Sequence, residues 1–84
     1  MTPAQHKTKA QDLLTAFETP SPDRVVYTDQ NWLEIVTRAH LGRTAGTGAH
    51  YTAADALLAE TDAQRVHPDQ HFLRALTHAL LADL

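Results

Sequence analysis

The chain has 84 residues and a net charge of −3 at neutral pH, which is enough chain for one domain with a modest hydrophobic core. The absence of cysteine excludes disulfide bonds, thiolate metal ligands and a cysteine nucleophile. The acidic balance argues against nucleic-acid binding, and no apolar run reaches the ~20 residues that cross a bilayer. Residues 1–17 lack the apolar segment of a secretory signal, so we expect a cytoplasmic protein.

The first predicted helix begins at Thr2. Pro3 at the first helical position and Gln5 three residues after the threonine are typical of a capping box. The apolar stripe of this helix follows the helical period: Ala10, Leu13, Leu14 and Phe17. Two prolines within residues 19–23 end the helix. Residues 24–27 favour an extended linker, with a short helical turn as the alternative.

The second predicted helix starts near Thr28 or Asp29 and ends at Gly42, which fits a left-handed position after the last turn. Its predicted buried face consists of Trp32, Ile35, Val36 and Ala39. Two of the three glycines then make residues 43–50 a loop.

Two further helices follow the loop. Thr52 is the predicted cap of the third, with Asp55 placed to bond back towards it, and its buried face is Ala54, Leu57, Leu58 and Thr61. The fourth has Pro68 and Asp69 in its first turn and runs to the end of the chain. Its predicted apolar positions are Phe72, Leu73, Leu76, Ala79 and Leu80.

The similarity of two segments of the chain predicts an internal repeat. Residues 29–41 align without gaps onto residues 69–81, with six of thirteen positions identical. The sequence therefore predicts an all-α, compact four-helix domain over residues 1–84, which a duplication would divide into two similar hairpins, 1–41 and 42–84. The alternative is that two amphipathic helices resemble each other by composition alone. The repeat predicts that Trp32 and Phe72 are both buried, with the second and fourth helices facing each other at the centre.

Histidine is frequent, at six of 84 residues. His67, His71 and His78 share one side of the fourth helix with Arg74, opposite its apolar positions, so we expect a solvated face. The alternative is a metal-binding or proton-sensitive contact. The cationic Arg74 and the lack of a carboxylate on this stripe argue against a metal.

The candidate functional surface lies at the end of the second helix and in the following loop. It comprises Arg38, His40, Arg43, His50 and Tyr51, the densest basic cluster on an acidic chain. In the repeat, His40 occupies the position of Leu80, where a core residue is expected. The alternative is that His40 is a partly buried structural histidine and that the arginines merely favour the helix C-terminus. A helix-turn-helix is disfavoured because the third helix is acidic.

By exclusion, these patterns predict a small soluble accessory, regulatory or inhibitory protein that acts by binding another protein. The sequence shows no nucleophile with a base and no cofactor fingerprint, so we predict no enzymatic activity, no cofactor and no bound metal. Two alternatives are a homo-oligomeric structural module, such as a homodimer, and a small-ligand or histidine-based metal binder.

Overall fold

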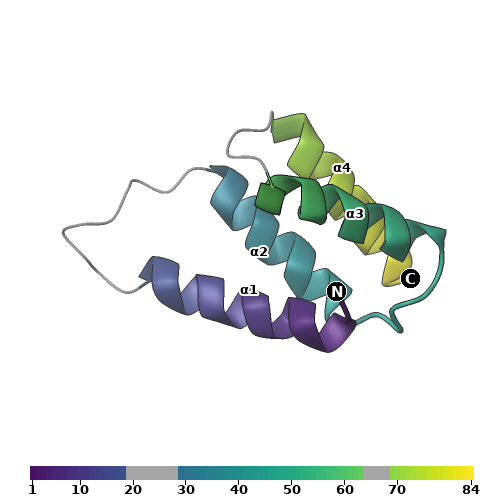
Figure 1. Ribbon diagram of the computed structural model, residues 1–84, viewed down its shortest axis with the longest axis horizontal. Helices are drawn as coiled ribbons and strands as arrows, with labels where there is room; N and C mark the ends of the chain where they lie inside the picture. The colour runs from purple at the N-terminus through teal and green to yellow at the C-terminus, as the bar shows by residue number, and fades with distance from the viewer. Residues whose placement is uncertain (19–28, 64–68) are drawn as a thin grey trace.

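The computed structural model describes residues 1–18, 29–63 and 69–84, and these form four helices (Figure 1). They are α1 (Pro3–Glu18), α2 (Asp29–Leu41), α3 (Ala49–Ala63) and α4 (Asp69–Ala82). The predicted all-α four-helix class is confirmed, and the described ranges contain no strand. The linker predicted for residues 24–27 lies outside the described residues.

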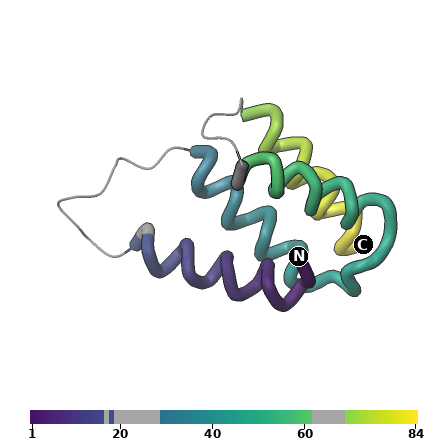
Figure 2. The backbone as a smooth tube through the Cα atoms, in the orientation of Figure 1, coloured from purple at the N-terminus to yellow at the C-terminus, as the bar shows by residue number. Residues whose placement is uncertain are grey.

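Helix α2 occupies the centre of the fold, between α1 on one side and α4 on the other, and α3 packs on α4 (Figure 2). Helices α2 and α4 run in the same direction. Gln30 donates from Nε2 to Asp69 Oδ1 at 3.1 Å near the N-terminal ends of the two helices. Near their C-terminal ends, His40 Nδ1 lies 3.4 Å from Asp83 Oδ2. The expected contact between the second and fourth helices is therefore present, whereas the internal repeat is not confirmed.

Of the two N-terminal caps predicted from the sequence, one is confirmed and one is wrong. The capping box of α1 is confirmed, because Thr2 N donates to Gln5 Oε1 at 2.8 Å and Gln5 N donates to Thr2 Oγ1 at 3.2 Å. The predicted cap of the third helix at Thr52 is wrong. Helix α3 begins three residues earlier, and Thr52 donates from its backbone and its hydroxyl to the carbonyl of Gly48. Gly48 itself has a φ of 96°, which favours glycine.

Gly42 does not have the left-handed conformation predicted for it. The glycines with positive φ are Gly46 and Gly48, and Gly42 N donates to Arg38 O at 2.9 Å in continuation of the helix. A Cβ at Gly42 would lie 2.9 Å from Lys7 Cβ and 3.2 Å from Lys7 Cα. Glycine is therefore needed here because α1 crosses the end of α2 at close range.

The hydrophobic core lies between α3, α4 and the end of α2. It is made of Leu41, Tyr51, Ala54, Leu57, Leu58, Ala75 and Ala79. The predicted buried face of the third helix is confirmed at Ala54, Leu57 and Leu58, and Phe72 is buried as expected.

The apolar faces predicted for the other helices are wrong in part. Trp32 is 41% exposed and Val36 is 43% exposed, and the buried residues of α2 are Ile35, Thr37, Arg38 and Leu41. Because α1 and α4 flank α2 on two sides, its buried side is wider than a single stripe and includes polar positions.

On α4, Leu73 and Leu80 are exposed by 47% and 44%, while the alanines at 75 and 79 face the core. On α1, Leu14 is exposed whereas Ala10 is buried, and the side chain of Phe17 lies outside the described part. Small residues on the inner side let the helices approach closely, so the leucines lie outside. None of the described helices is both long and apolar enough to span a membrane.

Candidate functional site

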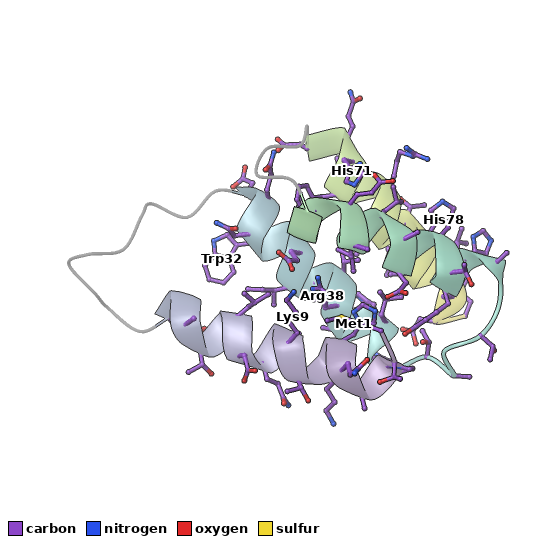
Figure 3. The ribbon with its side chains drawn as sticks, in the orientation of Figure 1. Met1, Lys9, Trp32, Arg38, His71 and His78 are labelled. Carbon is purple, nitrogen blue, oxygen red and sulfur yellow. The ribbon has the colours of Figure 1, made fainter. Side chains whose placement is uncertain are left out.

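A buried polar cluster joins α1, α2 and α3. His6 of α1 and Arg38 of α2 are both completely buried. His6 Nε2 lies 2.7 Å from Asp55 Oδ1 of α3, and His6 Nδ1 lies 3.0 Å from Arg38 Nη1. Figure 3 shows Arg38 and Met1 close together in the space between α1 and α3. The imidazole therefore bridges a carboxylate and a guanidinium from two other helices.

Arg38 is held on its own helix as well. Its Nε donates to Glu34 Oε2 at 2.8 Å, the i, i+4 arrangement in which two side chains meet on one helix face. Its Nη1 also lies 3.1 Å from Met1 Sδ. A fully buried guanidinium is tolerated only when it is paired and hydrogen-bonded, and Glu34 supplies a charge partner.

The start of the chain contacts the same cluster. The Met1 ammonium lies 3.1 Å from both carboxylate oxygens of Asp55, and the Tyr51 hydroxyl donates to Met1 O at 2.6 Å. The Tyr51 ring packs edge-on against His6, with 6.0 Å between ring centroids. Asp55 and Tyr51 lie one turn apart on α3, so this turn of α3 anchors the beginning of α1.

These contacts define the tautomer of His6. A guanidinium can only donate, so His6 Nδ1 accepts from Arg38, and the ring proton on Nε2 is donated to Asp55. Burial lowers the pKa of His6, and the positive charge of Arg38 lowers it further, while the hydrogen bond to Asp55 opposes both effects. His6 is therefore neutral in the folded protein at neutral pH. Burial, together with the charge of Asp55, raises the pKa of Tyr51.

The space inside the cluster is small. Its cavity measures about 60 Å³ and is lined by Met1, His6, Arg38, Asp55, Leu58 and Ala59. That volume holds a few water molecules at most. Both ring nitrogens of His6 are engaged, so the ring is not positioned to accept a proton from a substrate. The arrangement supports a structural role that ties three helices together.

The folded state should lose stability when the pH falls below 6.5. The pKa of His6 is lowered in the folded protein, so between that lowered value and the ordinary 6.5 the unfolded chain binds a proton that the folded chain does not. We expect the free energy of unfolding to decrease by up to about 1.4 kcal/mol per pH unit from this residue. Urea unfolding at pH 7 and pH 5.5 measures the decrease, with the non-titrating His6→Gln as control. An equal decrease in both proteins would show that His6 is not responsible.

The five residues predicted to form the partner-binding surface do not lie together on the surface. Arg38 and Tyr51 are buried in the polar cluster, so their placement on an exposed surface is wrong. His40 and Arg43 both approach Asp83, at 3.4 Å and 3.6 Å.

His50, the fifth predicted residue, is exposed on the first turn of α3, where its Nδ1 lies 2.9 Å from Nδ1 of His78. The basic cluster expected from the sequence is thus divided among three places. The comparison of His40 with Leu80 also fails, because Leu80 is exposed rather than in the core.

The histidine stripe predicted on the fourth helix is not a uniformly solvated face. The His71 side chain is largely buried, with Nε2 3.0 Å from the carbonyl of Leu57 and 3.5 Å from Glu60 Oε2. His78 packs on His50, with ring centroids 5.2 Å apart. His67 lies outside the described residues. Within the described ranges, no group of three histidine or acidic residues is close enough to hold a metal ion.

His6 is the residue of the polar cluster that the sequence interpretation missed. It lies four residues before Ala10, and it therefore continues the stripe of Ala10, Leu13 and Phe17 by one helical turn. A titratable residue in line with an apolar stripe is the signal that could have identified it.

Comparisons of the chain with protein-family models, curated proteins and solved structures found no match.

Proposed function

We propose that this protein is a small accessory or regulatory protein that acts by binding another protein through the exposed face of α2. The observation that carries the proposal is the exposure of Trp32, at 41%, with Val36 exposed to a similar extent one turn later. Figure 3 shows Trp32 at the N-terminal end of α2, away from the polar cluster.

An exposed tryptophan on a rigid helix is typical of a binding surface. Tryptophan is enriched among the residues that dominate protein–protein affinity, because its large ring excludes water from the contact. Trp32 is the only tryptophan of the sequence, and among the described residues the core cluster does not include it. An adjacent branched apolar side chain, Val36, widens the apolar surface along the same side of α2.

Two of the basic residues predicted for partner binding extend this surface. His40 follows Val36 by one turn, and Arg43 lies just beyond the helix, with its side chain 72% exposed. The exposed guanidinium of Arg43, which lies 3.6 Å from Asp83 Oδ2, can also attract an acidic partner towards the apolar patch. We therefore propose a protein partner that offers an apolar pocket with acidic residues at its edge.

The test is a comparison of variants in a binding assay. Tagged protein captures candidates from the native host, and each candidate is purified and titrated against the protein while Trp32 fluorescence and acrylamide quenching are followed. A partner that covers Trp32 should reduce the quenching and should bind about 30-fold more weakly to Trp32→Ser, the loss expected for an interface anchor.

The matched control is Leu14→Ser, since Leu14 is an apolar residue of α1 with a similar exposure of 39%. This variant should bind the partner like the unmodified protein. Candidates that bind Trp32→Ser and the unmodified protein with equal affinity would contradict the proposed function of the α2 face.

A further inference from the structure

The outer side of α4 carries the spacing of a coiled-coil seam. Leu73, Thr77 and Leu80 follow one another on α4 at intervals of four and three residues, the alternation of d and a positions in a heptad, and Leu84 continues this spacing just beyond the end of α4. Leu73 and Leu80, the two d positions, are nearly half exposed, and Leu84 is completely exposed. The seam lies away from the positions at which α4 meets the core, which are Phe72, Ala75 and Ala79.

Thr77, at the central a position, suits an apolar contact. Its hydroxyl donates to the carbonyl of Leu73 at 2.8 Å, so its hydrogen-bonding requirement is met within the helix. What remains on the seam is a small methyl group, which lets another helix approach closely. From Leu73 onwards the seam therefore presents apolar atoms and no polar group that contact would leave unsatisfied, whereas the preceding a position is the polar Gln70.

A surface pocket beside the seam has a shape that could receive a leucine side chain from a second helix. It is lined by Gln70, Leu73, Arg74 and Thr77, with His78 at its end. The first four are spaced i, i+3, i+4 and i+7, as are the four residues that form a hole for one side chain of the facing helix in a coiled coil. In a parallel pair aligned in register, the side chain opposite this hole is Leu73 of the other chain.

The charged residues beside the seam also favour a parallel pair of α4 helices in register. Asp69 lies at the g position before Leu73, and Arg74 lies at the following e position. In a parallel coiled coil, each g residue faces the e residue five positions later on the other helix, so Asp69 of each copy meets Arg74 of the other. Gln30 donates to Asp69 Oδ1 and so orients this carboxylate.

We propose that the α4 seam binds a second copy of this chain, with the two α4 helices parallel and in register around a two-fold axis. The seam lies on α4, whereas the proposed partner surface lies on α2, so the inference does not rest on the proposed function. Two heptads bury less than the ~800 Å² per partner of a standard interface. The dimer is therefore a concentration-dependent equilibrium with the monomer.

Sedimentation equilibrium of the full chain over a range of concentrations tests the proposal. The unmodified protein should show a monomer–dimer equilibrium. Asp69→Arg alone and Arg74→Asp alone should each weaken the dimer about tenfold, because each places like charges opposite each other twice. The combined variant with both changes should restore the affinity, because the charges are again complementary. Asp12→Arg, a charge reversal at an exposed position of α1, should leave the dimer unaffected.

Leu80→Glu should abolish the dimer while the circular dichroism of the helices is retained, because Leu80 is exposed in the monomer. A protein that stays monomeric at millimolar concentration would overturn the proposal, as would a double charge exchange that fails to restore the dimer. Loss of the dimer in Trp32→Ser would place the second copy on α2 and would also overturn it. The titration of purified partners tests the α2 surface separately, so either idea can fail alone.

Discussion

Replacing Arg38 with methionine is expected to lower the free energy of unfolding by about 3–5 kcal/mol, the usual cost of removing one partner from a buried ion pair. Methionine retains most of the length of the arginine stem, so the loss reports mainly on the guanidinium. Without it, Glu34 has lost its charge partner, and His6 Nδ1 has lost its donor. A domain of this size has a total stability of only about 5–15 kcal/mol, so the change should be obvious in urea unfolding.

The matched control is Arg43→Met, which removes an exposed guanidinium 3.6 Å from Asp83. Exposed ion pairs contribute about 0–1 kcal/mol, so this variant should unfold close to the unmodified protein. Adding Glu34→Gln to Arg38→Met should recover part of the lost stability, because it removes the uncompensated carboxylate. Equal losses in Arg38→Met and Arg43→Met would contradict the account of the cluster.

Phe72→Ala should also have a large effect. We expect it to lower the free energy of unfolding by about 3–5 kcal/mol, because Phe72 is buried and its removal leaves a cavity. Trp32→Ala should lower the free energy of unfolding clearly less, although the two residues occupy aligned positions in the two similar segments, because much of the Trp32 surface is already in contact with water. Thermal unfolding of both variants measures the difference. Similar losses would mean that Trp32 is a core residue, which would remove the basis for the proposed binding surface.

Much of the fold could be predicted from the periodicity of apolar residues and from helix-capping residues. The capping box at Thr2 and the buried face of α3 follow from local rules that hold in any helical protein. The exposure of Trp32 and Leu80 could not be obtained in this way. A stripe of apolar residues indicates that a helix packs on something, but which flank of the stripe is covered depends on where the neighbouring helices lie.

The candidate site could be predicted from the sequence less well than the fold. Arg38 was assigned to the partner-binding surface because it belongs to the basic cluster near the loop, but the arrangement of α1 and α2 buries it against His6, while Glu34 lies one turn away on the same helix. Asp55 was interpreted as part of a helix cap, whereas it binds His6 from a different helix. Each of these errors comes from treating a polar residue by its local sequence when its partner lies on another element.

The polar cluster and the close contact of α1 with Gly42 both affect the order in which the helices pack during folding. The contacts of His6 with Arg38 and with Asp55 join residues 32 and 49 positions apart, and the cluster is complete only when all three helices are in place. Closing such long chain segments costs entropy before any contact is gained, whereas each helix forms through local contacts. We therefore expect α1 to dock after α3 and α4 have paired, because the contact of His71 with Leu57 joins residues only 14 positions apart. For the same reason its amides should exchange with solvent through an opening that leaves α3 and α4 together.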